Sequence, residues 1–408
     1  MNSAARIELG KVAHLLSGGT PPKSDPAHWI GDVPWVSPKD MKRRFICDVP
    51  DHVSQEAARR YSTVAPENSI LVVVRGMVLA KDFPVALIRK PMAINQDMKA
   101  IVAADEVDPT FLLFAILSEK RAIQKEIGSS AHGTRRLSSE SLERLIIPMP
   151  PLPDQLSIAT SLANIQAAID VQISLVASLR DLKRETMATL FREGLRAEPV
   201  TQTEIGLLPK SWRLTSLLEA AFITEGQVDP RVEPFASMVH VGPDSVESGT
   251  GRLLNTRRAK ELALISGKYQ FSAGQIVYSK IRPYLRKVWA ASFDGLCSAD
   301  MYPLHVSNRF NADFLAAFLL ADTFTAQVVA LQDRTGIPKV NRQQLRLCWV
   351  PQPSEDEQRD IAEVSSILHS NYEHAVERLR LLYELFDVTL QELMSGCVDV
   401  KSRTEVRS

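Results

Sequence analysis

The longest uninterrupted amphipathic segment of this chain constrains its fold more than any other feature. Between Gln155 and Glu193 there is no proline or glycine, and apolar residues recur at steps of three and four. This spacing predicts one helix of about 40 residues, roughly 60 Å long at 1.5 Å per residue. A narrow apolar stripe of that length needs a partner helix of similar length.

A candidate partner occurs in the same chain, 203 residues later. Residues 357–396 carry apolar side chains at the same spacing, again without proline or glycine before Gly396. The two segments therefore predict a coiled coil made within one chain. Its expected seam consists of Ile158, Leu162, Ile165, Ile169, Val176, Leu179, Leu368, Tyr372, Leu379, Leu382, Phe386 and Leu393. Leu182 and Leu190 are expected to continue the first stripe.

The spacing of 203 residues reflects an internal repeat. Residues 97–159 and their counterparts share thirteen identities in 63 ungapped positions, against roughly four expected by chance. Each copy has strand-like runs (69–74; 275–278), an amphipathic helix (111–127; 314–331), a loop with glycine, and a short strand closed by prolines. The expected fold class is α+β, with two mixed α/β domains joined by two long antiparallel coiled-coil helices. The expected divisions are 1–153, 154–196, 197–356, 357–400 and a tail at 401–408, with a punctuated connector before Trp212.

The charge of the chain is balanced overall but not by region. Residues 1–150 hold 20 basic and 17 acidic side chains, residues 201–350 hold 17 and 13, and residues 351–408 hold 6 and 12. The domains therefore suit an anionic partner better than the second long helix does. The cysteines Cys47, Cys297, Cys348 and Cys397 have no paired spacing, which predicts reduced core thiols. Without a signal peptide or an apolar run of 18 residues, a cytoplasmic protein with no membrane segment is expected.

The usual catalytic motifs are missing from the sequence. Ser17–Ser24 has Pro22 where a phosphate loop needs glycine, and no dinucleotide fingerprint or methyltransferase motif is found. His52, His132 and His240 stand alone in polar segments and are predicted to be solvated. We expect no catalytic residue, no metal site and no cofactor.

Three groups of residues resemble the specificity subunits of type I restriction–modification systems. The first is Gly19-Thr20-Pro21 followed by the segment His28–Val36, which looks like the opening of a target-recognition domain. The second is the connector Thr203–Trp212, and the third is the Pro-x-Pro entry to each long helix, with Asp154 where the family usually has Glu. The second half lacks the Gly-Thr-Pro opening, so the resemblance implies two diverged recognition domains and an asymmetric DNA target.

The resemblance implies a non-catalytic subunit that binds double-stranded DNA and assembles with other subunits. The implied partners are methyltransferase (modification) subunits, expected to be two, and restriction subunits with motor and nuclease activity. The long helices would then space the two recognition domains, and helix length would set the length of the DNA spacer.

Basic side chains are the expected DNA contacts, because Arg and Lys pair with phosphates and with guanine in the major groove. In the first half these are Lys39, Lys42, Arg43, Arg44, Arg75, Lys81, Arg135 and Arg136. In the second half they are Arg252, Arg257, Arg258, Lys260, Tyr278, Lys280, Arg282, Arg286, Lys287 and Lys339, where the tyrosine is included because cations flank it.

Three alternatives stay open at the level of sequence. The chain could be the specificity subunit of a system whose methyltransferase and nuclease are fused. It could instead be a coiled-coil scaffold that does not bind DNA, or an enzyme with an unrecognised site. Binding to DNA that weakens with salt would separate a reader from a scaffold.

Overall fold

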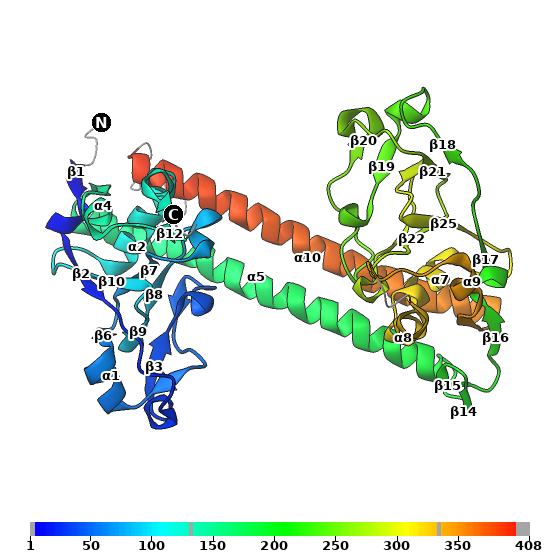
Figure 1. The fold of residues 1–408 in the computed structure, drawn as a ribbon, viewed down its shortest axis with the longest axis horizontal. Coiled ribbons are helices and arrows are strands. Elements are labelled where there is room, and N and C mark those ends of the chain that lie inside the picture. Colours follow the sequence, from blue (N-terminus) through cyan, green and yellow to red (C-terminus); the bar gives the residue numbers. More distant parts are fainter. Residues whose placement is uncertain (1–4, 130–133, 333–335, 397–408) are drawn as a thin grey trace, which may run out of the picture. The chain divides into compact units, whose positions relative to one another are not determined.

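The computed structural model describes residues 5–129, 134–332 and 336–396, which form two compact units. The first unit contains the described residues up to Val171 together with those from Leu379 onward, and the second runs from Gln172 to Arg378. Both units contain mixed sheets, short helices and parts of two long helices (Figure 1). The predicted fold class, mixed α/β domains joined by long helices, is confirmed.

The described part of the first unit has two larger sheets, a hairpin of β11 (Gly128–Ser129) and β12 (Arg135–Arg136), and a pair of strands from distant parts of the chain. The five-stranded sheet has the order β2 (Ala13–Ser17), β10 (Met98–Ala103), β7 (Ile70–Val73), β8 (Val85–Ile88) and β4 (Phe45–Ile46). The four-stranded sheet has the order β5 (His52–Val53), β3 (Val33–Val36), β9 (Met92–Ile94) and β6 (Thr63–Ala65). The pair consists of β1 (Ala5–Glu8) and β13 (Ile146–Met149). The helices are α1 (Gln55–Tyr61), α2 (Pro109–Ser118), α3 (Lys120–Glu126) and α4 (Ser139–Glu143).

The second unit repeats this order of elements. One sheet has the order β17 (Ala221–Ile223), β25 (Met301–Val306), β22 (Ile276–Ser279) and β23 (Val288–Ala290). The other has the order β18 (Gln227–Val228), β21 (Lys268–Phe271), β24 (Gly295–Cys297), β19 (Val239–Val241) and β20 (Arg257–Arg258). The strand pair is β16 (Arg213–Ser216) with β26 (Trp349–Gln352). The helices are α6 (Leu217–Ala220), α7 (Ala312–Leu319), α8 (Asp322–Leu331) and α9 (Arg342–Arg346).

The same parallel contact occurs in both units, which supports the repeat found in the sequence. Trp35 lies opposite Ala93 in the β3–β9 pair, and His240 lies opposite Leu296 in the β19–β24 pair. Ala93 and Leu296 are 203 residues apart, so the repeat extends to the register of the strands.

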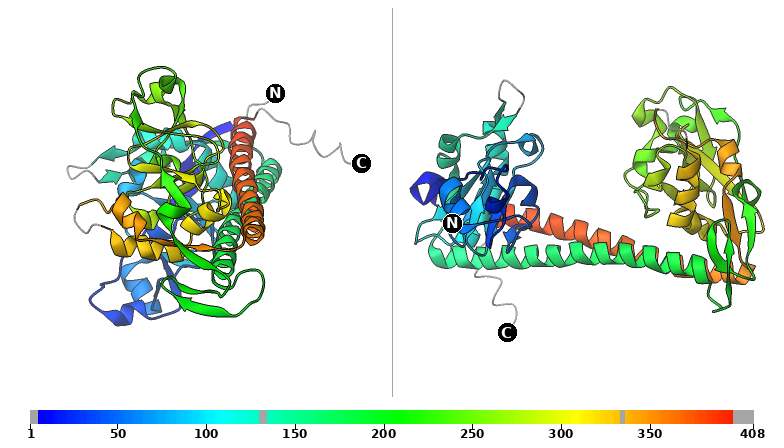
Figure 2. Two further views of the ribbon diagram at one scale, coloured as in Figure 1. Left: turned by 90° about the vertical axis from the view of Figure 1, so that its right-hand side faces the viewer. Right: turned by 60° about the horizontal axis from the view of Figure 1, so that its bottom comes forward.

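The long helices are α5 (Leu152–Glu193) and α10 (Glu355–Ser395), which lie side by side in all views (Figures 1 and 2). In the second unit the Gln172 side chain donates to the Ala375 carbonyl at 2.8 Å, and Lys183 contacts His369. Higher numbers on α5 thus meet lower numbers on α10, as an antiparallel pair requires. In the first unit, Phe386 and Leu390 of α10 share a core with Leu162 and Ile169 of α5.

All twelve residues expected in the seam are buried or half-buried in the structure. The continuation of the stripe to Leu182 is wrong, because this side chain is 52% exposed. Among the described residues, α5 is long and apolar enough to cross a membrane, with a mean hydropathy of 1.4 over 18 residues, and the bent pair of α7 and α8 passes the same test if counted as one span. The buried polar side chains Gln155 and Gln172 of α5 bond to other parts of the chain, as expected of a helix packed in protein.

Three local predictions need correction. The helices expected at 111–127 and 314–331 are each broken in two, and α7 and α8 are bent by 62°. The connector before Trp212 contains a hairpin, β14 (Val200–Thr203) with β15 (Gly206–Pro209), in which the positive φ of Gly206 permits the turn. Cys47 is exposed and is not a core thiol; Cys297 and Cys348 are buried, and Cys397 lies outside the described residues.

A buried glutamine fixes the start of each long helix. The Gln155 side chain accepts from the Asp108 amide at 3.0 Å and donates to the Pro150 carbonyl at 2.9 Å. Gln358, its counterpart, accepts from the Asn311 amide at 2.8 Å and donates to the Pro353 carbonyl at 3.1 Å. Each member of the first set lies 203 residues before its counterpart in the second set. The identity of Gln155 and Gln358 is therefore explained by the same hydrogen-bond network in both units.

We expect Gln155→Leu to destabilise the first unit by about 2–3 kcal/mol, because two buried backbone groups lose their partner. A lower midpoint for the first thermal transition of the full chain would show this loss. The matched control is Gln124→Leu at an exposed position of α3, which should change stability by less than about 0.5 kcal/mol. Equal effects of the two substitutions would contradict the assigned role.

Candidate nucleic-acid interface

In the first unit, two segments far apart in sequence bring basic residues together at the end of β7. Arg75 forms an antiparallel bridge with Arg136, which belongs to β12 (Arg135–Arg136) of a short hairpin with β11 (Gly128–Ser129). The Gly76 amide donates to the Arg135 carbonyl at 3.0 Å. Gly76 has φ of 137°, a conformation that glycine adopts without strain. The turn thus places Arg75 and Arg136 side by side, both exposed.

The second unit builds the same arrangement at the end of β22. Ile281 forms an antiparallel bridge with Lys339, and the Arg282 amide donates to the Pro338 carbonyl at 2.7 Å. The Lys280 carbonyl accepts from the Val340 amide at 2.9 Å. Lys339 is the repeat counterpart of Arg136, so both units use the same loop.

An aspartate anchors the first basic residue in each unit. The Asp97 carbonyl accepts from the Val74 amide at 2.9 Å and from the Arg75 amide at 3.2 Å, and the Asp300 carbonyl accepts from the Lys280 amide at 3.0 Å. In the bridge pattern Lys280 therefore corresponds to Val74. Asp97 and Asp300 belong to the Asp-Met identity of the repeat. We define the reading clusters as Arg75, Arg135 and Arg136 in the first unit and Lys280, Arg282 and Lys339 in the second.

A hollow of about 620 Å³ lies beside the second reading cluster. Arg257 and Arg282 line it together with His240 and Asn255. Asn pairs with adenine and Arg with guanine through two hydrogen bonds each, so this wall carries groups suited to base edges. Asn255 was not predicted; its only signal in the sequence is the adjacent run of polar and basic residues up to Arg258.

His240 is not the solvated loop residue that the sequence predicts. It lies half-buried in β19, and burial and the nearby Lys268 lower its pKa to about 4. At neutral pH the ring is therefore uncharged. Its Nε2 atom is buried without a hydrogen-bond partner among the described residues, on the wall of the same hollow. His52 lies in β5, and His132 is outside the described residues.

Five predicted contacts point into the protein. Tyr278 is 3% exposed and packs against Phe324, with ring centroids 6.0 Å apart. Arg44 is half-buried, and burial lowers the pKa of its guanidinium. The other three have partners in the fold: Arg252 with Glu373 at 3.2 Å, Arg286 with Asp322, and Lys287 with the Pro243 carbonyl. The prediction that Tyr278 contacts DNA is wrong, because its buried ring is not accessible.

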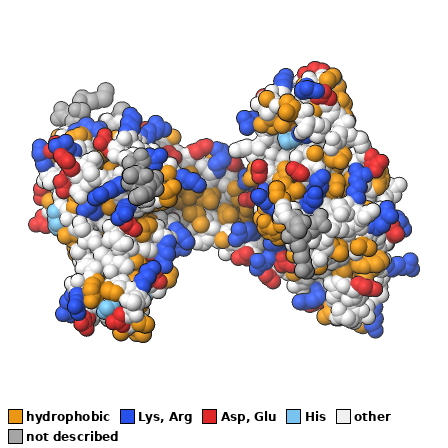
Figure 3. All heavy atoms as spheres, viewed as in Figure 1, with side chains coloured by type: hydrophobic (Ala, Val, Ile, Leu, Met, Phe, Trp, Pro, Cys, Tyr) orange, Lys and Arg blue, Asp and Glu red, His pale blue; other side chains and the backbone are white. Residues whose placement is uncertain are grey.

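The remaining candidates lie at the surface. Lys39 is exposed but pairs with Asp51 at 2.6 Å. Exposed side chains outside the clusters are Lys42, Arg43, Lys81, Arg257, Arg258 and Lys260. Figure 3 shows basic side chains gathered on the visible face of each unit. Exposure alone does not separate a DNA contact from an ordinary solvated charge.

The Gly-Thr-Pro motif of the first unit has a structural role. The Trp35 indole donates to the Gly19 carbonyl at 3.1 Å, and Trp29 packs edge-on against Trp35. A Cβ atom at Gly19 would lie 2.0 Å from the Tyr61 carbonyl oxygen, so only glycine fits. Thr20 bonds to Asn95 and to the exposed Gln96, which adds two amides near the first reading cluster that the sequence did not single out.

The described residues contain no group of three or more His, Cys, Asp or Glu side chains arranged to hold a metal ion. Burial raises the pKa of both Cys297 and Cys348 to about 12, which leaves these thiols protonated and unreactive.

Comparisons with known proteins agree with this description. Residues 4–175 match the profile of a family described as the type I restriction modification DNA specificity domain. The chain is 37% identical over 158 residues to the Escherichia coli type I restriction enzyme EcoDI specificity subunit. That match covers 39% of this chain and 35% of the relative. A match to the Methanocaldococcus jannaschii MjaIX specificity subunit has 23% identity over 253 residues, 57% of this chain and 56% of the relative.

Solved structures show the same fold over nearly the whole chain. The S subunit of a type I restriction–modification system from M. genitalium has a TM-score of 0.61 at 15% identity and covers 97% of both chains. A chain from a study of assembly and conformational transition of the type I R-M system has a TM-score of 0.50 at 15% identity, covering 98% of this chain and 99% of that one. The curated relatives are matched over about one third to one half of their length.

Proposed function

We propose that the chain is the DNA sequence-specificity subunit of a type I restriction–modification complex, because residues 4–175 match the type I restriction modification DNA specificity domain. Each recognition domain, 1–153 and 197–356, binds one half of a bipartite DNA target. The observation that carries the proposal is the pair of reading clusters, which have the same backbone hydrogen bonds in both units.

The two halves of the target differ in sequence in this proposal. The two loops share their backbone hydrogen bonds, but only Arg136 and Lys339 stand at equivalent positions: the first cluster has three arginines, and the second has Lys280, Arg282 and Lys339. The second cluster also lies beside the hollow that Asn255 and His240 line. Because base identity is read by side chains, different side chains on the same backbone read different bases.

The exposed apolar side chains of the long helices support a role in assembly. Leu381, Leu385 and Val388 follow one face of α10 and are 50%, 51% and 56% exposed, and Val171 of α5 is 68% exposed. Figure 3 shows apolar side chains gathered on the visible part of these helices. Patches of this kind mark protein interfaces. The proposed partners are methyltransferase subunits, two per complex, and restriction subunits, separate or fused; the complex acts in the cytoplasm, and this chain is its non-catalytic part.

Salt dependence of binding tests the proposal directly. The full chain, with its methyltransferase partner, should bind duplex DNA that contains the sequence motif methylated in the host. The affinity should fall steeply as the salt concentration rises, because Lys and Arg side chains that contact phosphates release counterions from the DNA. The target itself is identified by methylome sequencing of the host with and without this chain. Loss of one bipartite motif is expected on deletion. An unchanged methylome, together with no salt-sensitive DNA binding, would favour the scaffold.

A further inference from the structure

Lys183 of α5 occupies a position at which the repeat has a core phenylalanine. Its counterpart, 203 residues later, is Phe386, whose ring packs against Phe114 with centroids 5.8 Å apart. The counterpart of Phe114 is Ala317. The second unit therefore replaces two aromatic rings by a lysine and an alanine. The fold as such does not need a lysine here, because the first unit fills the same place with apolar side chains.

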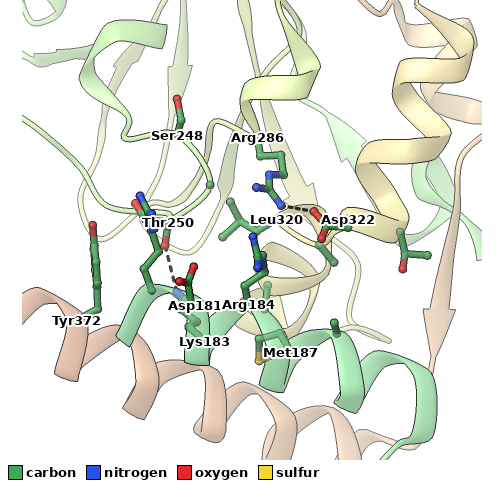
Figure 4. Close-up of a pocket in the computed structure, with 16 residues that line it drawn as sticks. Asp181, Lys183, Arg184, Met187, Ser248, Thr250, Arg286, Leu320, Asp322 and Tyr372 are labelled. Carbon is green, nitrogen blue, oxygen red and sulfur yellow. Dashed lines mark hydrogen bonds and ion pairs between the residues drawn. The ribbon is translucent and has the colours of Figure 1, made fainter. Parts of the chain in front are cut away.

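A hollow of about 290 Å³ occupies the space beside Lys183 (Figure 4). One wall is apolar and includes Met187, Ala317 and Leu320. The rest carries four cationic side chains, Arg180, Lys183, Arg184 and Arg286, against the carboxylates of Asp181 and Asp322. Asp322 is paired with Arg286, and Arg184 is paired with Glu185 at 2.9 Å, so Arg180 and Lys183 remain against the single carboxylate of Asp181.

The Lys183 ammonium group has one hydrogen-bond donor left over. Its Nζ donates to the Thr250 carbonyl at 3.1 Å and lies 3.3 Å from His369 Nδ1. An ammonium group has three donors, and no carboxylate of the described residues lies within 4.0 Å of this one. Burial lowers the pKa of Lys183 to about 8, so the charged form is held in an unfavourable setting. Burial also lowers the pKa of His369 to about 4, which makes it a neutral acceptor.

Charged and titratable groups face Lys183 from every element packed against it. They are Glu247 and Arg252 of the loop before β20, His369, Tyr372 and Glu373 of α10, Arg180, Asp181 and the pair Arg184–Glu185 of α5, Asp313 of α7, and the pair Arg286–Asp322. Glu373 pairs with Arg252 at 3.2 Å, and Glu247 accepts from the hydroxyls of Tyr372 and Thr250. These carboxylates are thus already engaged with other groups.

We propose that this hollow binds a small organic phosphate, with the phosphoryl group against Lys183 and the neighbouring arginines and the organic part against Met187, Ala317 and Leu320. The phosphoryl oxygens supply the acceptor that Lys183 lacks and offset the excess of cations. A partly apolar cavity with a few converging cations suits a ligand with an apolar body and an anionic end. The site lies outside the reading clusters and does not depend on their function.

The test is calorimetric and thermal-shift titration of the full chain with adenosine monophosphate, inorganic phosphate and adenosine. We expect adenosine monophosphate to bind, inorganic phosphate to bind at least tenfold more weakly, and adenosine not to bind. Lys183→Met should remove binding while leaving the protein folded, because its counterpart position is apolar. Lys210→Met, at an exposed site outside the hollow, is the matched control and should bind as the unchanged chain does.

The pH dependence of binding adds a readout that a general charge effect would not give. Lys183 must be protonated to hold the phosphate, so affinity should be constant between about pH 7 and pH 8 and fall up to tenfold per pH unit above pH 8. The phosphate of the nucleotide, with its second pKa near 6, does not change charge there. The proposal would be overturned if the folded chain did not bind adenosine monophosphate, or if the Lys183→Met variant bound it equally well. It would also be overturned if duplex DNA, and not adenosine monophosphate, raised the thermal midpoint.

Discussion

Replacement of Arg75 and Arg136 by glutamate should reduce binding of the cognate target by about 100-fold or more. The two side chains lie together on an exposed turn, and each is a phosphate or base contact in the proposed function. A lost base contact costs about 1–3 kcal/mol, and each lost phosphate contact lowers the salt dependence by about one unit of slope. Fluorescence anisotropy over a range of salt concentrations measures both quantities.

The second cluster supplies the comparison for that experiment. Lys280, Arg282 and Lys339 changed to glutamate should give a similar loss, but the base preference that relaxes should belong to the other half of the target. The matched control for the first cluster is Arg59→Glu together with Arg60→Glu on the exposed face of α1, which carries the same charge change as the double substitution of Arg75 and Arg136. An equal loss in this control would show that total charge, and not the cluster, determines binding.

A longer helix pair should change the DNA spacer without changing either half of the target. Duplication of residues 165–171 in α5 and of 376–382 in α10 adds one heptad to each helix and keeps the apolar faces aligned. Seven residues add about 10.5 Å. This length corresponds to about three base pairs at 3.4 Å each, which is the upper limit for the increase.

Selection from a DNA library with fixed half-sites and randomised spacer length measures this effect. We expect the preferred spacer to lengthen by one to three base pairs. The control duplicates the heptad in α5 only, which disrupts the pairing of the helices and should weaken binding for every spacer. A preferred spacer that stays the same in the matched duplication would refute the role of the helices as a ruler.

The sequence predicted the repeat, the strands and the long helices because their signals are strong and local. Gln155 and Gln358 are identical since each satisfies the same buried backbone groups, and such identities survive divergence of the rest. The break at Glu119 was missed because α2 is buried on all sides, so its seven consecutive buried residues give no helical period. A continuous apolar run cannot show where one helix ends and the next begins.

The sequence predicted which types of residue form the candidate site, but not which of these side chains face the surface and which face the core. Arg44, Arg252 and Arg286 look like Arg75 in a sequence, yet they are half-buried, whereas the Arg75 side chain is 63% exposed and lies 4.0 Å from its acidic neighbour Asp97. Tyr278 was chosen for its basic neighbours, but strand alternation turns its ring into the core. Conversely, His240 and Asn255 are far from Arg282 in the sequence, and it is the fold that places all three around one hollow.

Gln172 gives the helix pair a fixed alignment. An apolar seam by itself allows two helices to slide past each other by whole heptads, since leucine and isoleucine pack equally well against the next leucine. The buried Gln172 amide donates to the carbonyl of Ala375, whose side chain is small, whereas a shift by one heptad would place the bulkier Leu368 or Leu382 opposite Gln172. These two positions are also repeat counterparts, 203 residues apart. This contact thus fixes which residues of the two helices lie opposite each other, and the length of each helix on either side of it follows from the sequence alone.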